Sequence, residues 1–227
     1  EDLIAVNAMY RPATMKLIDD YCNHKHGRKA VPSVHPLVDD LLTETYGIMI
    51  YQEQVMQVAN RLGKFPLSKA LTLIKAISKK KEKFILDCGV GFVEGAMSNG
   101  IDRKSAEKLY DLVVEFGNYG FNKAHATRYA IVAYQAAFFK LYYPKEFFAA
   151  TLTFESGDQN KVVQYMNDAA RMRVRIAPPD VNTCDSDFVI DGDMVRFGLS
   201  AVKNVGEKAV EEISRARRAE GGFKNLA

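Results

Sequence analysis

The stretch Tyr119-Gly-Phe-Asn-Lys-Ala-His125 constrains this chain more than any other part of the sequence. It places an aromatic ring, an amide, a cation and an imidazole in one short segment next to a glycine, which gives the backbone conformational freedom. The segment that follows, 127–141, carries small and apolar residues on nearly every face of a helix. A helix that is apolar all round is usually buried. The sequence therefore predicts a polar loop that leads into a buried central helix.

Composition limits the class of protein. The 227 residues are 48% apolar and 26% charged, as in an ordinary globular protein. Because the formal net charge is only +3, any affinity for nucleic acid must come from local patches. The 3 cysteines form no Cys-x-x-Cys pair, which favours free thiols in a reducing cytoplasm. The first residue is not Met and no signal-peptide pattern follows it, so we expect a fragment of a longer cytoplasmic protein.

Apolar residues at helical spacing predict a mainly α-helical fold. Proline, glycine and asparagine separate the periodic segments, and Ile48 to Tyr51 is more typical of a strand. The segments in which we expect helices are 3–10, 15–21, 35–42, 52–62, 84–99, 105–116, 147–154 and 161–171.

A further helix, starting near Leu67, carries a row of lysines. Lys75, Lys79 and Lys83 recur every four residues and so share one face, opposite an apolar stripe. Like charges at this spacing repel by about 0.2–0.5 kcal/mol per pair. Together with Lys80 and Lys81, they form a cluster of cations that favours an anionic ligand. A solvated lysine face is the alternative interpretation.

The polar loop also favours an anion. Lys123, His125, Arg128 and the N–H groups at the start of the following helix can converge on one phosphate. A hydrogen-bonded structural histidine is the alternative. A histidine-dependent hydrolase has little support, because no serine or cysteine stands near His125 in a nucleophile arrangement. Cys22, His24 and His26 alternate by two, which splays their side chains and favours solvated residues over a metal site.

After residue 173 the apolar period changes to that of strands. Segments 174–176, 188–190 and 194–197 have strand character, and Asp191-Gly192 predicts a hairpin between the last two. Segment 199–213 then has the pattern helix, glycine turn, helix.

This last pattern resembles the helix-hairpin-helix family. In that family, N–H groups at the hairpin meet a DNA phosphate without reading base sequence. The resemblance makes Lys203, Asn204, Val205 and Gly206 the candidate DNA-binding residues. A plain pair of packed helices is the alternative.

Four motifs follow one another in an informative order. They are Thr45-Tyr-Gly-Ile-Met-Ile-Tyr-Gln-Glu-Gln-Val-Met56, the stretch 119–125, Tyr143-Pro-Lys-Glu-Phe147 and Pro178-Pro-Asp-Val-Asn182. Together they make the chain similar to the fingers region of the alpha subunit of bacterial DNA polymerase III, a C-family replicative polymerase. The resemblance covers essentially the whole chain.

The resemblance implies a fold and an activity. It implies a mainly α, multi-helical fingers region over 1–172, a small strand-rich segment over 173–198 and the start of a helix-hairpin-helix region over 199–227. The family transfers a nucleotidyl group from a dNTP to a primer, with two Mg²⁺ ions held by palm aspartates. No equivalent acidic motif occurs here, so we expect no metal site in this chain and no activity of the fragment alone.

The resemblance also implies partners and site residues. The partners are primer-template DNA, a dNTP and other replisome subunits, with no membrane. The residues that we expect to bind the nucleotide are Lys75, Lys79, Lys80, Tyr119, Asn122, Lys123 and His125.

One departure from the family pattern concerns the nucleotide grip. The family usually has Ala-Asp-x-Leu-Arg-Arg-Ala-Met-Gly-Lys-Lys where this chain has 70–80, so Ile74 and Lys75 replace an arginine pair. Lysine offers a point charge instead of a planar fork. Either the grip has moved onto the lysines, or the chain is a divergent, noncatalytic module that binds DNA or docks onto a replisome.

Overall fold

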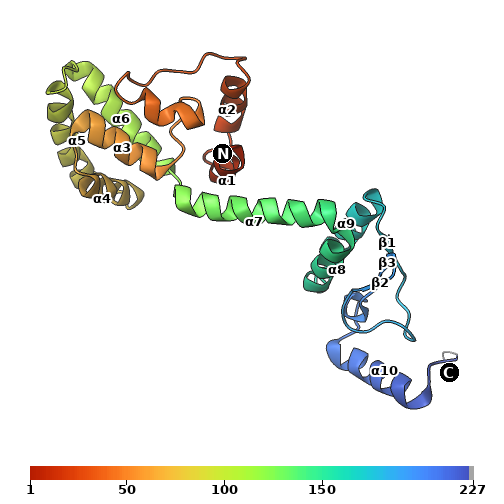
Figure 1. Cartoon of the computed structure of the whole chain (residues 1–227). Coiled ribbons are helices and arrows are strands. Elements are labelled where there is room, and N and C mark those ends of the chain that lie inside the picture. The colour runs from red at the N-terminus through yellow and green to blue at the C-terminus, as the bar shows by residue number, and fades with distance from the viewer. Residues whose placement is uncertain (225–227) are drawn as a thin grey trace. The chain divides into compact units, whose positions relative to one another are not determined.

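The computed structural model describes residues 1–224, and the chain divides into two compact units, Glu1–Val132 and Ala133–Ala227. The first unit is helical (Figure 1). Its elements are α1 (Asp2–Met9), α2 (Leu17–Lys25), the 3-10 helix η1 (Asp39–Thr45), α3 (Gln52–Gly63), α4 (Leu67–Ser78), α5 (Glu82–Met97), α6 (Arg103–Tyr119) and the first part of α7 (Lys123–Tyr142).

The main core of the first unit lies among α3, α4, α5 and α6, which pack against one another (Figure 1). Phe92 of α5 is fully buried at its centre, with its ring centroid 6.1 Å from that of Phe65 and 5.3 Å from that of Tyr110. Burying a side chain of this kind contributes about 1.5–3 kcal/mol. The apolar stripes in the sequence therefore do form the core of a helical bundle.

A second, smaller core joins segments that are far apart in the sequence. Met9 of α1 and Tyr21 of α2 pack with Ile50, Tyr51 and Ala126. The extended segment before α3 and the first turns of α7 thus lie in one apolar cluster with the N-terminal helices.

The predicted lysine stripe is wrong. Helix α4 ends at Ser78, and the chain turns at Lys80, whose φ is 51°. The N–H of Lys81 returns to the carbonyl of Ala76 at 3.0 Å, and Lys83 belongs to α5. The chain has to reverse here because α5 packs back onto α3 and α4. Lys79 and Lys80 therefore lie in a turn, not on a helix face.

The expectation of a buried helix after the polar loop is also wrong. Within residues 1–224, the buried side chains of α7 are those of Ala126 and Ala130. Tyr129, Val132 and Tyr134 are exposed, although an apolar helix surface of this kind is usually buried against another element. Apolar periodicity reports only that a helix has apolar faces, not that a partner covers them.

Two short elements also differ from expectation. Residues 48–51 form no strand beyond a single parallel bridge, Tyr51 to Phe121. The helix expected over 35–42 is instead the 3-10 helix η1, and its C-terminal neighbour Tyr46 has a φ of 51°. Short segments have too few residues for their period to be decisive.

The second unit holds the rest of α7 and a small sheet. Its elements are α8 (Pro144–Phe154), α9 (Gln159–Arg171), β1 (Arg175–Ile176), β2 (Val189–Asp191), β3 (Met194–Arg196), the 3-10 helix η2 (Leu199–Ala201) and α10 (Glu207–Glu220). The strand order is β1-β3-β2, with β1 parallel and β2 antiparallel to β3. Phe148, Leu152, Cys184 and Val195 are fully buried in its core.

The predicted hairpin is confirmed, one position later than expected. Asp191 pairs with Met194, so Gly192 and Asp193 form the two-residue loop, and Gly192 has a φ of 60°. Glycine adopts such a φ without steric cost. The first helix expected in 199–213 is a single 3-10 turn, η2, in place of a full helix.

Candidate functional site

The polar loop is shorter than the sequence indicates. Helix α6 runs to Tyr119 and α7 begins at Lys123, which leaves only 120–122 between them. Backbone hydrogen bonds fix this linker to the segment before α3. The N–H of Phe121 donates to the carbonyl of Ile50 at 3.0 Å, and the N–H of Gln52 donates to the carbonyl of Phe121 at 2.9 Å.

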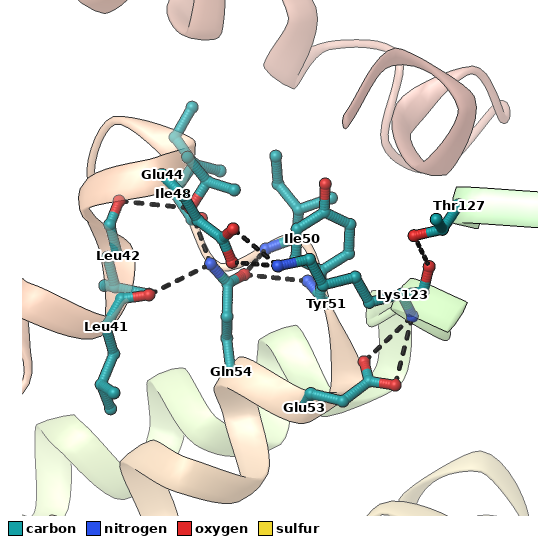
Figure 2. A network of polar contacts seen from close by, with 11 residues as sticks. Leu41, Leu42, Glu44, Ile48, Ile50, Tyr51, Glu53, Gln54, Lys123 and Thr127 are labelled. Carbon is teal, nitrogen blue, oxygen red and sulfur yellow. Dashed lines mark hydrogen bonds and ion pairs between the residues drawn. The ribbon is translucent and has the colours of Figure 1, made fainter. Parts of the chain in front are cut away.

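Glu53 caps the start of α7. Its two carboxylate oxygens lie 3.2 and 3.0 Å from the backbone nitrogen of Lys123 (Figure 2). One of them also accepts a hydrogen bond from the amide of Asn122 at 2.9 Å, and the Oδ1 of Asn122 accepts the N–H of His125 at 2.8 Å. The first N–H groups of a helix lack partners within it and favour negative charge. Protein groups thus already occupy the place where an anion was expected.

The side chain of Lys123 is held by a second carboxylate. Its Nζ lies 2.8 and 2.6 Å from the two oxygens of Glu44 and 5.3 Å from the ring centroid of Tyr51 (Figure 2). Burial, and then the charge of Glu44, raise the pKa of Tyr51, so its phenol stays protonated. The positive charge of Lys123 is thus balanced by the carboxylate of Glu44 within the first unit.

Gln54 fixes the backbone beneath these groups. Its Oε1 accepts the N–H groups of Ile50 and Tyr51 at 2.9 and 3.0 Å, and its Nε2 donates to Oγ1 of Thr45 at 2.8 Å (Figure 2). Gln54 is buried, so all of these bonds are shielded from water. The segment that receives Phe121 is consequently a rigid support.

Arg11 holds the same linker from the N-terminal side. Its guanidinium donates to the carbonyl of Tyr119 at 2.7 Å and to that of Ala8 at 2.9 Å. It also lies 4.6 Å from the ring centroid of Phe121, in cation–π geometry. Burial lowers the pKa of Arg11, which nevertheless stays charged because an arginine starts from so high a value.

His125 lies between two aromatic rings. Its ring centroid is 5.4 Å from that of Phe121 and 4.7 Å from that of Tyr129, and the side chain is exposed. Asn122, Lys123 and His125 thus lie together at the start of α7. Tyr119 is the last residue of α6, and its backbone carbonyl accepts the hydrogen bond from Arg11.

The lysines of the candidate nucleotide site come from another element, the end of α4 and the turn that follows it. Lys75, Lys79 and Lys80 are exposed, whereas Ile74 is 3% exposed and belongs to the core. Among residues 1–224, no ion pair involves these three lysines. Of the two positions that carry arginine in the family pattern, only 75 thus offers a cation to solvent.

The candidate DNA-binding residues form the turn before α10. Asn204 has a φ of 67°, and Gly206 is the N-cap residue of α10. Lys203, Asn204 and Gly206 are exposed, and Val205 is partly buried against the core of the second unit.

Comparisons with known proteins identify the family. Residues 1–100 match the family of the bacterial DNA polymerase III alpha subunit finger domain, and residues 173–227 match a helix-hairpin-helix motif. The whole chain is 41% identical over 231 residues to the DNA polymerase III subunit alpha of Thermus aquaticus. The chain therefore belongs to the bacterial DNA polymerase III alpha subunit family.

Other relatives carry the same name. All of the chain aligns with the DNA polymerase III subunit alpha of Chlamydia trachomatis at 40% identity over 226 residues, and with that of Bacillus subtilis at 40% over 226 residues. The chain spans 19%, 18% and 20% of the length of the Thermus, Chlamydia and Bacillus proteins. What the chain contains is thus the finger domain and the helix-hairpin-helix region of a DNA polymerase III alpha subunit.

Sequence reasoning missed the residues that support the polar loop of this polymerase region. Glu53 lies inside the motif 45–56, and Arg11 directly precedes Pro12, but the sequence does not indicate that either residue holds the loop. Glu44 and Glu53 are separated from Lys123 by 79 and 70 positions. No spacing rule links carboxylates to a lysine so far along the chain.

No helix in the described part of the chain is long and apolar enough to span a membrane.

Proposed function

We propose that this finger domain helps a template-directed DNA polymerase to bind the triphosphate of the incoming dNTP and the primer-template DNA. The observation that carries the proposal is the group of exposed lysines, Lys75, Lys79 and Lys80, at the end of α4. Ile77 of α4 packs on Gly117 of α6, which brings the C-terminal ends of these two helices together. The lysines therefore lie toward the end of α6 from which the polar loop starts, and cations grouped in this way favour a polyanion.

Within this proposal the loop residues have different roles. Asn122 and Lys123 hold the loop, because Glu53 and Glu44 already engage their side chains. Tyr119 lies on the nucleobase side of the site. His125, which is exposed at the start of α7, contacts phosphate.

Lys75→Ala and Lys79→Ala, made separately in the full-length polymerase, are each expected to raise the KM for dNTP about tenfold, because one charge-assisted phosphate contact is lost. Steady-state primer extension measures this. Lys104→Ala is the matched control, since Lys104 is an exposed lysine in the first turn of α6, at the opposite end of that helix from Tyr119. If the KM for dNTP of both the Lys75 and the Lys79 variant is as low as that of the Lys104 variant, these lysines do not bind the triphosphate.

The reaction implies metal ions, and we propose that Mg²⁺ is held by acidic residues outside this chain. Among residues 1–224, no group of three His, Cys, Asp or Glu side chains is arranged to hold a metal ion. Glu44 and Glu53 are already engaged by Lys123. No step is therefore assigned to a metal bound here, and we expect the isolated chain to be inactive.

We further propose that the turn 203–206 contacts DNA phosphates without reading sequence. The exposed cation Lys203 and the N–H groups before α10 support this. With Lys203→Ala in the full-length protein, the slope of log Kobs against log salt is expected to become shallower by about one, as for the loss of one phosphate contact. Fluorescence anisotropy with a primed duplex measures it. Arg171→Ala is the control, because Arg171 is an exposed cation at the end of α9. If the salt slope is the same for the two variants, Lys203 does not contact a DNA phosphate.

The proposal includes the surroundings of the chain. It divides the chain into a fingers region over 1–172, a strand-rich segment over 173–198 and the start of a helix-hairpin-helix region over 199–227. The polymerase acts in the cytoplasm with other replisome subunits. A noncatalytic module that binds DNA or docks onto a replisome is the second candidate, favoured by the replacement of the arginine pair at 74 and 75. Palm aspartates encoded upstream in the same gene would decide against it.

A further inference from the structure

A groove of about 550 Å³ runs between α5 and α6. Its apolar wall comes from Leu86 and Val90 of α5 and from Val114 of α6. Leu86 is 71% and Val90 64% exposed, although both are large apolar residues. They stand four residues apart and so lie one above the other on the same face of α5. Apolar side chains grouped in a concave surface mark a binding site more often than scattered ones do.

The floor of the groove is preformed. Tyr110 of α6 lies across Gly89 of α5, where a Cβ atom would approach its ring to 2.9 Å. The hydroxyl of Tyr110 donates to the carbonyl of Ile85. Because the ring is fixed at both ends, a ligand would meet a surface that does not have to rearrange, which lowers the entropic cost of binding.

The rim of the groove is acidic. Glu94, Glu107, Asp111 and Glu115 line it, against one cation, Arg103, which lies 3.8 Å from Glu107 in an ion pair. A phosphate backbone would be repelled here, so the groove is not part of a DNA path. Two copies of this chain that met groove to groove would bring like charges together. A helix with lysines or arginines on either side of an apolar stripe would complement both the apolar wall and the acidic rim of the groove.

We propose that the α5–α6 groove docks a basic amphipathic helix of a partner protein. Leucine-type side chains of that helix, at i, i+3 or i+4 and i+7, occupy the wall formed by Leu86, Val90 and Val114. Its lysines or arginines face Glu94 and Asp111. No residue that lines the groove belongs to the proposed nucleotide or DNA contacts.

The first test uses a defined probe with the full-length protein. The probe is a fluorescein-labelled peptide of roughly 18 residues, five helical turns, with leucines along one face and lysines elsewhere. The comparison peptides are a scrambled form and a form with glutamate in place of lysine. Anisotropy is expected to show binding of the amphipathic lysine peptide, weakened by salt, and no binding of the other two.

Variants locate the binding. Leu86→Ser with Val90→Ser is expected to weaken the lysine peptide about tenfold or more, because two exposed apolar contacts are lost while the core is untouched. Asp111→Lys with Glu115→Lys is expected to do the same through charge. Leu67→Ser, an exposed leucine at the start of α4, is the matched control and should bind like the wild type. Equal affinity in all of these proteins, or equal binding of the glutamate peptide, would overturn the proposal.

A second measurement separates the possible occupants. Photoreactive benzoylphenylalanine in place of Val90 is expected to crosslink to the lysine peptide in the full-length protein. A crosslink within the same polypeptide would show that another part of the polymerase covers the groove. A crosslinked dimer, with a matching increase in sedimentation coefficient, would show that a second copy covers it. Either of these two results would overturn the proposal.

Discussion

Gly95→Ala is expected to lower the free energy of unfolding by about 3 kcal/mol or more, at the upper end of what overpacking costs. A Cβ atom at this position would lie 2.1 Å from the carbonyl oxygen of Gly63 and 2.5 Å from its carbonyl carbon. Both of these are backbone atoms, so no side-chain rotation relieves the clash, and α3 and α5 would have to move apart. That movement would open the core around Phe92, which touches the same crossing. Chemical denaturation followed by circular dichroism measures the change.

Gly91→Ala is the matched control on the same helix. A Cβ atom there would lie 3.4 Å from the end of the Lys69 side chain and 3.8 Å from the ring of Phe65, both ordinary or easily relieved contacts. Alanine in place of glycine stabilises a helix interior by about 0.5–1 kcal/mol. The two variants are therefore expected to change stability in opposite directions. A similar small effect of both would show that α3 and α5 do not cross at Gly63 and Gly95.

The bundle could be predicted where burial leaves a periodic pattern. The apolar face of α3 was expected over 52–62, and the helix covers Gln52–Gly63, because its face is buried on neighbouring helices. The crossing that permits this packing was not predictable. Gly63 and Gly95 stand 32 positions apart, and a glycine in a helix has no feature of its own that tells a close approach from a neutral position.

The periodicity of apolar and charged residues did not predict which helix faces are buried against neighbouring elements, or where a helix ends. Lys75, Lys79 and Lys83 have the spacing of one helix face, yet the chain reverses at Lys80, because the burial of Ile77 and Phe92 requires α5 to fold back. Similarly, α7 has the composition of a buried helix and carries exposed aromatic residues. For α7 the local pattern is correct, and the missing information is which elements lie beside the helix. For the lysines the helix itself ends at Ser78, before the pattern does.

The candidate site shows the same division. Tyr119, Asn122, Lys123 and His125 were predictable as a group because they are neighbours in the sequence. Their supports were not, because a carboxylate 70 positions away leaves no local pattern. The conformation of the loop is thus decided by contacts between residues that are far apart in the sequence. Each of these residues is of a type common on protein surfaces, so the sequence does not mark it as a support.

Glu53→Ala is expected to lower the free energy of unfolding by about 2 kcal/mol, because a charge-assisted cap and its bond to Asn122 are lost together. If Glu53 positions the loop for the nucleotide, kcat/KM for dNTP should also fall about tenfold, from a misplacement of the loop of the order of an ångström. Thermal unfolding and primer extension measure the two effects in the full-length polymerase. Glu53→Gln should recover part of the stability, since its amide oxygen still accepts the N–H of Lys123.

Glu44→Gln separates capping from charge pairing at the same loop. The side chains of Glu44 and Lys123 are 32% and 38% exposed, so water screens their ion pair and its loss should cost less than about 1 kcal/mol. A cost for Glu53→Ala no larger than for Glu44→Gln would mean that the start of α7 does not depend on its cap. A stability loss for Glu53→Ala with kcat/KM unchanged would mean that the cap holds the helix but that the loop has no part in nucleotide binding. Only a loss of both, with KM changing more than kcat, places the conformation of this loop in the binding of the incoming nucleotide.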